Sequence, residues 1–454
     1  MTSAGGSAAR AWIERCAGVL AHVTSLPDGR LDAGARFARY AAASGFRVWQ
    51  ILPTGPVDRY GSPYLPDSAF AGNADLLGAA DGAAAADRGH SFAAEHADWL
   101  PDYALFRALR LEHGGLPWYE WPARLRDRAP AALEAARARL APVIADIARE
   151  QHAFDRTWRA FKADLNAQGL KLFGDVPLFL AHDSADAWTH RELFQLDANG
   201  LCEAYMGVPP DAFSATGQDW GCPPYRWEAM RAEGFRWWTR RFAVQARRFD
   251  LIRIDHFRGL AAYWRIPRGA MATEGAWTPG PGRAALDALG GVLGDVRLVA
   301  EDLGYITDDV VALRKALGLP GMRVLQFAFD SGPDNPHLPQ HHGPDCVVYT
   351  GTHDNDTTLG WWRHLDEPLR NAVRHYLGQS DPRMPEALVE CAWASPAPLA
   401  VVPLQDLMGL GSEARMNTPG TERGNWRWRF DWPQLPEASK TRETLLRYRR
   451  LPET

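Results

Sequence analysis

Three acidic residues stand at the ends of short apolar runs in the second half of the chain. They are Asp255 in RIDHF, Glu301 in AEDLG and Asp354 in THDND. The carboxyl ends of strands in a parallel barrel converge on one pocket, so we expect these side chains to meet. One such acid alone would more often be a structural or pairing residue. Three of them are much harder to explain as structure.

Cleavage of a glycosidic bond is the chemistry that suits these carboxylates. The reaction needs an acid for the leaving oxygen and a carboxylate against the developing oxocarbenium ion. Arg253 stands two residues before Asp255 and points to the same side of a strand, where it favours the ionised carboxylate. Glu301 must start protonated, which burial or a like-charged neighbour favours by raising its pKa. Asp354 could then accept hydrogen bonds from ring hydroxyls and help to distort the sugar.

A metal site is the competing interpretation of the same acids. Arg253, His256 and His353 are interleaved with them, and these donors suit sugar hydroxyls better than the oxygen cage of a hard metal. A metal-dependent barrel hydrolase would need a histidine pair such as H-x-H after the first strand, whereas this chain has His22-Val23-Thr24. We therefore expect neither a metal nor a cofactor.

Eight apolar runs could form the strands that position these acids. They cover residues 18–27, 46–56, 170–179, 250–259, 296–304, 322–330, 346–356 and 398–409. Helix-like stretches lie between them, at 35–44, 235–249, 308–318 and 367–378 among others. Near-continuous apolar strands that alternate with helices predict an α/β fold, a (β/α)8 TIM barrel that spans residues 1–454 as one catalytic domain.

Three long insertions interrupt the predicted barrel. Residues 57–169 are expected to form a helical subdomain whose tract at 130–166 is a solvated helical face packed on the barrel. Residues 180–234 are interpreted as a loop-like substrate insertion, and residues 266–295 as a Gly- and Pro-rich one. Insertions at the carboxyl ends of barrel strands are where substrate loops grow.

Composition excludes several classes of protein. The 454 residues are 46% hydrophobic and 23% charged with a net charge of -5, which is typical of a globular enzyme and unsuited to binding nucleic acid or anionic lipid. The chain has an odd number of cysteines, five, and they lack C-x-x-C spacing, so neither a disulfide framework nor a zinc site is indicated. The N-terminus does not resemble a signal peptide and no apolar run is long enough for a membrane span, so we expect a cytoplasmic protein.

The 19 tryptophans outnumber both the 18 phenylalanines and the 12 tyrosines. Flat, amphipathic rings suit stacking on sugar faces. A tryptophan-rich core is the simpler explanation, and the count alone does not decide between them.

The strings FDLIRIDHFRG, LVAEDLGYIT and VVYTGTHDNDTT resemble the signature strands of the amylomaltases, or 4-α-glucanotransferases, which are relatives of the α-amylases. The resemblance continues in YGSPY, GDVPLFLAHDSADAW, GVPPDAFSATGQDWG, GLPGMRVLQFAF and MNTPGTERGNWRWR, and covers nearly the whole chain. It implies transfer of an α-1,4-glucan segment between malto-oligosaccharides, starch or glycogen chains through a glycosyl-aspartate. Asp255 would be the nucleophile, Glu301 the acid/base and Asp354 the residue that stabilises the transition state.

The resemblance also implies nine sugar-contacting positions, which are Ser62, Tyr64, Asp211, Gln218, Trp220, Arg253, His256, His353 and Asn417. Tyr64 and Trp220 could instead be core aromatics, although flanking Pro and Gly favour loops. The chain departs from the family pattern in a shorter turn after SLP, at Cys222 and at Ala212, and these changes bear on the outer subsites.

Two alternatives remain open from the residues alone. A retaining α-glucan hydrolase would use the same carboxylates, and only the family resemblance favours a transferase over it. A non-catalytic glucan-binding protein would not need three acids at strand ends. Neither the oligomeric state nor the preferred chain length follows from the sequence.

Overall fold

The computed structural model describes residues 12–78, 89–210 and 214–451. Eight parallel strands form one sheet in the order β10-β11-β12-β1-β2-β3-β6-β9. Their bounds are β1 (Cys16–Leu20), β2 (Val48–Gln50), β3 (Lys171–Val176), β6 (Leu251–Ile254), β9 (Arg297–Ala300), β10 (Gly321–Val324), β11 (Cys346–Tyr349) and β12 (Leu399–Pro403). Each of the eight predicted apolar runs overlaps one of these strands.

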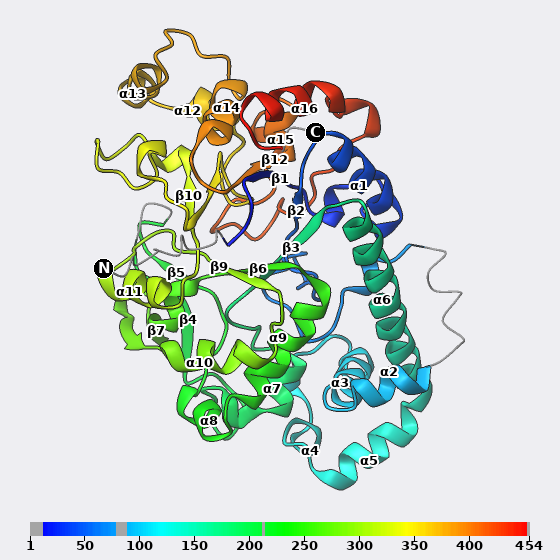
Figure 1. Cartoon of the computed structure of the whole chain (residues 1–454). Coiled ribbons are helices and arrows are strands. Elements are labelled where there is room, and N and C mark those ends of the chain that lie inside the picture. Colours follow the sequence, from blue (N-terminus) through cyan, green and yellow to red (C-terminus); the bar gives the residue numbers. More distant parts are fainter. Residues whose placement is uncertain (1–11, 79–88, 211–213, 452–454) are drawn as a thin grey trace, which may run out of the picture.

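The sheet curves until its two edge strands meet (Figure 1). The N–H of Ala300, the last residue of β9, donates to the carbonyl of Pro320, just before β10, at 2.9 Å. Strands β1, β11 and β12 are buried along their whole length, as expected where helices cover the outside and side chains fill the inside. The fold is therefore the predicted (β/α)8 barrel.

Helices surround the barrel where amphipathic stretches alternate with the strands. They include α1 (Gly34–Ala43), α9 (Arg236–Arg248), α10 (Arg283–Asp287), α11 (Asp308–Ala316), α12 (Thr358–His364), α13 (Glu367–Leu377), α14 (Glu386–Ala394), α15 (Leu404–Leu407) and α16 (Ala438–Arg447). In α1 the buried residues Phe37, Ala38 and Ala41 recur at helical spacing, so one face packs inward.

Helices also fill the segment between β2 and β3. They are α2 (Gly89–Glu95), α3 (Leu100–Glu112), α4 (Ala123–Arg126), α5 (Pro130–Arg139) and α6 (Ala141–Ala167). The tract at 130–166 is thus two helices, and Pro142 in the first turn of α6 suits a helix start. Phe154, Trp158 and Leu165 of α6 are buried, and the Trp158 indole donates to the Arg248 carbonyl at 3.1 Å.

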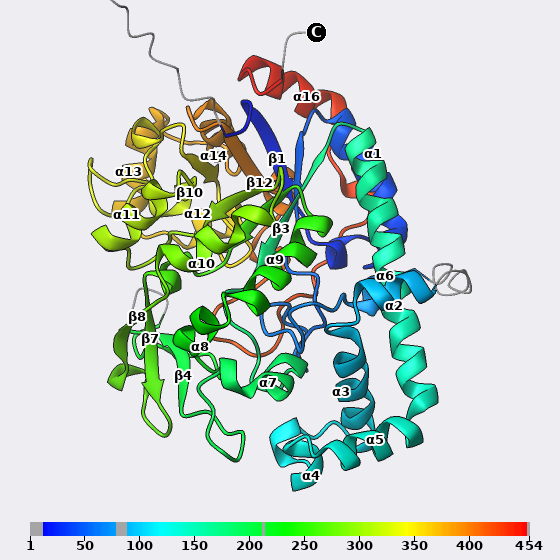
Figure 2. The same cartoon turned by 60° about the horizontal axis from the view of Figure 1, so that its bottom comes forward.

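A second, antiparallel sheet lies beside the barrel in the order β5-β4-β7-β8 (Figure 2). It consists of β4 (Ala204–Val208), β5 (Gln218–Asp219), β7 (Ala262–Pro267) and β8 (Ala276–Pro279). The segment 180–234 also carries α7 (Ala185–Thr189) and α8 (Trp227–Ala232), so it has more regular structure than a loop. Because β4 pairs with β7, strands from before and after β6 form one sheet.

The core has two parts. Inside the barrel, Val48, Phe173, Leu251, Val347 and Val401 form one apolar cluster with their neighbours, and a larger cluster fills the space between barrel and helices. Within the described ranges, no helix combines the length and the apolar character that crossing a bilayer would require.

Candidate active site

The three acids lie directly after barrel strands. Asp255 follows β6, and Glu301 follows β9. These strands are neighbours in register, with Ile254 opposite Ala300, so the two acids emerge side by side. Asp354 lies in the turn after β11. The arrangement results from parallel strands whose carboxyl ends share one edge of the barrel.

Arg253 is the charged centre of this edge. It lies in β6 with its side chain 5% exposed, and its Nη1 is 2.8 Å from an Asp255 oxygen. The same nitrogen donates to both carboxylate oxygens of Asp175, at 3.0 and 2.8 Å. Asp175 is opposite Arg253 in the pairing of β3 with β6, and its side chain is fully buried. One guanidinium thus faces two carboxylates, and such contacts favour ionised acids.

Asp175 and Tyr64 extend this network away from Asp255. The Tyr64 hydroxyl donates to Asp175 at 2.7 Å. Burial, and next the charge of Asp175, raise the pKa of Tyr64, so the hydroxyl remains a donor. Asp175 was not among the predicted residues, although an acid inside the third apolar run, one residue before the end of β3, was the available signal.

Glu301 is held by backbone donors. Its Oε2 accepts from the N–H of His256 at 2.8 Å, and its Oε1 from the N–H of Leu303 at 2.9 Å. His256 has a φ of 53°, a left-handed conformation that is uncommon for a residue other than glycine. This conformation accompanies the contact between its N–H and Glu301.

Burial raises the pKa of both carboxyl groups. For Glu301 burial is the largest cause, opposed by the charge of Arg253 and by the two backbone N–H donors. For Asp255 burial is again the largest cause, opposed by Arg253 and assisted by the nearby charges of Asp175, Glu301 and Asp354. The site therefore retains protons at a pH where free carboxyl groups have lost theirs. The direct ion pair favours a negative charge on Asp255 rather than on Glu301.

Asp354 is oriented by three neighbours. Its Oδ1 accepts from Asn417 Nδ2 at 2.6 Å, and its Oδ2 is 3.2 Å from His353 Nε2. Arg415 donates to the Asp354 backbone carbonyl at 2.6 Å, and to the carbonyl of Asn417 at 2.7 Å. Burial lowers the pKa of His353, so a neutral ring faces Asp354. Arg415 was not among the predicted residues.

An aromatic wall connects the two sides of the site. The rings of Tyr64 and His353 stack with centroids 5.0 Å apart and planes 11° apart, and Trp426 lies 5.7 Å from Tyr64. Trp426 has a φ of 64°, again in the left-handed region, and its N–H donates to the Met416 carbonyl at 2.8 Å. Trp426 lies in the quoted string MNTPGTERGNWRWR, but the sequence alone gave no reason to select it.

Trp220 and His256 bring the neighbouring antiparallel sheet to the carboxylates. Their rings meet edge to face with centroids 4.8 Å apart, and the Trp220 indole donates to Gln218 Oε1 at 3.3 Å. The His256 Nε2 atom is buried without a hydrogen-bond partner, and burial lowers the pKa of this ring to about 3. A neutral imidazole with an unused nitrogen suits a bound hydroxyl.

The remaining predicted positions have other surroundings. Ser62 Oγ accepts from the N–H of Tyr64 at 3.3 Å, so its contact in the structure is to the loop that carries Tyr64. Cys222 is buried, and its carbonyl accepts from the N–H of Met206 at 2.8 Å, so this family departure packs inward. Asp211 and Ala212 lie outside the described residues.

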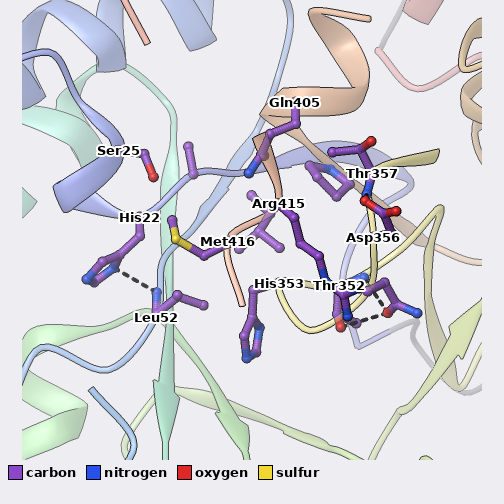
Figure 3. A pocket seen from close by; sticks show the side chains of 14 residues that line it. His22, Ser25, Leu52, Thr352, His353, Asp356, Thr357, Gln405, Arg415 and Met416 are labelled. Carbon is purple, nitrogen blue, oxygen red and sulfur yellow. Dashed lines mark hydrogen bonds between the residues drawn. The ribbon is translucent and has the colours of Figure 1, made fainter. Parts of the chain in front are cut away.

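A pocket is lined by His353, the neighbour of Asp354 (Figure 3). His22 and Ser25 line one side, and Asp356, Gln405 and Arg415 line the other. The His22 Nδ1 atom accepts from the N–H of Leu52 at 3.2 Å, and burial lowers the pKa of this histidine to about 3. None of the three predicted catalytic acids lines this pocket, so it is not the proposed reaction centre itself.

Among residues 12–78, 89–210 and 214–451, no group of three or more His, Cys, Asp or Glu side chains has the arrangement of a metal site. The contacts described above instead balance the carboxylates with Arg253, backbone N–H groups and neutral donors. These are partners that sugar hydroxyls can share or replace.

Comparison with known proteins places this geometry in a family. A family model described as 4-alpha-glucanotransferase matches residues 21–88 and 79–434. The chain is 44% identical to the 4-alpha-glucanotransferase of Thermus thermophilus, with 92% of this chain and 95% of that protein covered. It is 41% identical to that of Synechocystis sp., with 93% and 95% covered.

A solved structure agrees with these relatives. The amylomaltase from Streptococcus agalactiae in complex with acarbose has a TM-score of 0.91 and 30% sequence identity, with 97% of this chain and 100% of that chain covered. Sequence and fold agree over nearly the whole length, so the chain belongs to the 4-alpha-glucanotransferases, the amylomaltases.

Proposed function

We propose that this 4-alpha-glucanotransferase moves an α-1,4-glucan segment from one malto-oligosaccharide to the 4-hydroxyl of another by two displacements at one carbon. The observation that carries the proposal is the ion pair of Arg253 with Asp255 at 2.8 Å, next to a Glu301 whose pKa is raised by burial. One carboxylate is thereby ready to attack, and one carboxyl group is ready to give a proton.

In the first step an Asp255 oxygen attacks the anomeric carbon of the donor. The bond from this carbon to the leaving oxygen breaks, and Glu301 gives its proton to that oxygen. The glucan is then an ester of Asp255, and the remainder of the donor departs as an alcohol. Arg253 favours the ionised state of Asp255 before the attack and again after release of the product.

In the second step the ester is transferred to a sugar. Glu301, now ionised, accepts the proton of the acceptor 4-hydroxyl while that oxygen attacks the anomeric carbon, and the bond to Asp255 breaks. Two displacements at one carbon retain the α configuration. Asp354, oriented by Asn417 and His353, would accept hydrogen bonds from the ring hydroxyls of the sugar.

The other predicted positions would hold the glucan. The wall of Tyr64, His353 and Trp426 offers ring faces, and the free Nε2 of His256 offers a hydrogen-bond partner. Trp220 covers His256 from the side of the second sheet. An ordered acceptor sugar competes with water because its hydroxyl is supplied at high effective concentration.

Incubation with pure maltotriose tests the proposal. Transfer gives glucose together with oligosaccharides longer than three units, while the number of reducing ends stays constant. A rise in reducing ends with no longer products would instead identify the retaining hydrolase, which uses the same acids. Both quantities can be followed in one time course by separating the products by length and titrating the reducing ends.

We also propose malto-oligosaccharides and starch- or glycogen-derived α-1,4-glucans as substrates, and the cytoplasm as the location. All five cysteines are free thiols, which supports a reducing compartment. The proposal of α-glucan substrates is supported by the acarbose complex of the streptococcal amylomaltase.

A further inference from the structure

An exposed aromatic ladder lies on the second sheet and the loop after β9. Trp264 and Trp277 are directly paired across β7 and β8, with ring centroids 5.2 Å apart. Tyr305 continues the ladder, because its ring stacks on Trp277 at 6.2 Å with the planes 19° apart. Tyr305 is 63% exposed, whereas Trp264 and Trp277 are half-buried. We call these three residues the aromatic platform.

Arg258 keeps the platform rigid. Its guanidinium carbon lies 3.6 Å from the centre of the Trp277 ring and 5.8 Å from that of Tyr305. The same guanidinium donates to the Tyr305 carbonyl. An arginine over an indole is a favourable cation–π contact. Arg258 therefore supports the exposed Tyr305 through its backbone carbonyl and its ring, although Tyr305 does not belong to the hydrophobic core.

The platform lies on the loops that carry the reacting acids. Arg258 comes three residues after Asp255, and Tyr305 four residues after Glu301. These two loops leave neighbouring barrel strands, and the second sheet reaches the carboxylates through Trp220. Two loops and one sheet therefore connect the platform to the carboxylate edge of the barrel.

We propose that the aromatic platform is a remote subsite for a long α-1,4-glucan, where a sugar several units from the reacting bond stacks on the exposed ring of Tyr305, which Trp277 and Arg258 support. This inference rests on the proposed function, because it takes the polymer to be the substrate of the carboxylate site. The occupant is a linear glucan because flat rings match the apolar faces of pyranoses. The Tyr305 hydroxyl at the ring edge can also meet sugar hydroxyls.

The test compares the binding of maltotriose and of linear amylose by calorimetry, in protein that carries Glu301→Gln so that turnover is slow. Adding Tyr305→Ala lowers the ratio of amylose affinity to maltotriose affinity about three- to tenfold, the effect of losing one stacking contact. Tyr305→Phe keeps the ring and retains most of the ratio. Leu111→Ala on α3, where Leu111 is 62% exposed, is the matched control and keeps the original ratio.

Two results would overturn the inference. One is an unchanged affinity ratio in Tyr305→Ala, and the other is an equal loss in Leu111→Ala. The proposed transferase function is tested separately, by the products that the unmodified chain makes from maltotriose. If the unmodified chain extends maltotriose but Tyr305→Ala leaves the affinity ratio unchanged, the subsite is refuted and the transferase function stands. If Tyr305→Ala lowers the affinity ratio but the unmodified chain only hydrolyses maltotriose, the transferase function is refuted and the subsite stands.

Discussion

Asp175 is the residue whose role is most visible in the structure and least visible in the sequence. It accepts a hydrogen bond from Tyr64 and contacts the same Arg253 nitrogen as Asp255, so it holds the guanidinium that faces the proposed nucleophile. It also carries a negative charge that raises the pKa of Asp255. Asp175 thus acts on the reaction through Arg253, as a positioning residue.

Asp175→Asn is expected to lower kcat about 10- to 100-fold, because a loosely held Arg253 misplaces Asp255. Its second effect is on pH dependence. Without the Asp175 charge the pKa of Asp255 falls, so the acid limb of the kcat/KM profile moves to lower pH. A purely structural role would lower activity equally at every pH. Circular dichroism first shows that the variant is folded, and the pH–rate profiles of variant and parent then separate the two cases.

Glu301→Gln removes the proposed proton donor, and its single amide oxygen can accept only one of the two backbone N–H groups that the carboxylate accepts. The rate with malto-oligosaccharides is expected to fall about 10²- to 10⁴-fold. A donor with an activated leaving group needs no acid, and azide needs no base to attack the ester, so the two together should restore cleavage. The alkaline limb of the parent profile, where Glu301 loses its proton, should disappear. Glu301 would lose its assigned role if azide gave no glycosyl azide.

The β4–β5 hairpin is the element most concerned with the choice between water and sugar. Its two strands are short. Beyond them, the N–H of Trp220 donates to the Met206 carbonyl, and the N–H of Met206 donates to the Cys222 carbonyl. Trp220 then places its indole against His256, beside Glu301. In the proposed reaction, a tryptophan in this position would cover the glucan from one side.

Trp220→Ala is expected to shift the reaction toward hydrolysis. A sugar acceptor loses a stacking surface of about 1 kcal/mol, whereas water has no such contact to lose. The number of reducing ends formed per transfer event should rise while total cleavage falls less. Leu201→Ala, another exposed change near the same sheet, provides the control. An unchanged ratio of transfer to hydrolysis would show that the hairpin does not discriminate between the two acceptors.

The elements could be predicted from the sequence to different extents. The eight barrel strands could be found because each is a local run of mostly apolar, mostly buried residues. Strand β4 was interpreted as loop because it is stabilised by pairing with β7, which lies 58 residues later by their first residues, 204 and 262. Asp175 and Trp426 were not predicted as site residues for the same reason, because their partners Arg253 and Tyr64 are distant in the chain.

At the scale of the whole molecule, the tryptophans serve two purposes that the composition could not separate. Trp49, Trp118, Trp158, Trp188 and Trp238 are almost fully buried. Trp49, Trp158 and Trp238 pack between barrel and helices, whereas Trp118 and Trp188 pack inside the insertions, against His182 and Trp121. None of the five can contact a glucan. Trp220, Trp277 and Trp426 instead lie around the carboxylate edge with part of their surface exposed. The fully buried tryptophans therefore belong to the core, and sugar stacking is a role that we propose only for the partly exposed ones.

One buried arginine connects the first strand of the barrel to the last. Arg450 follows α16, is fully buried, and donates to six backbone carbonyls, those of Cys16, Ala392, Trp393, Ser395, Ala397 and Pro398. Cys16 begins β1, and the other five carbonyls belong to α14 and to the connection into β12. Since β1 and β12 are neighbours in the sheet, this contact fastens the first strand to the last.

Arg450→Met keeps most of the volume of the side chain but removes a donor from each of these carbonyls. Four of them keep another donor, because Arg15 also donates to Trp393, Ser395 and Ala397 and the Cys16 N–H donates to Pro398. Because unpaired buried acceptors are costly, we expect the free energy of unfolding to fall by about 3–5 kcal/mol. Arg447→Met, an exposed change one turn earlier in α16, should alter it by less than about 0.5 kcal/mol. Urea denaturation followed by tryptophan fluorescence measures both. Equal stability of the two variants would mean that the barrel closes without the Arg450 contacts, through strand pairing alone.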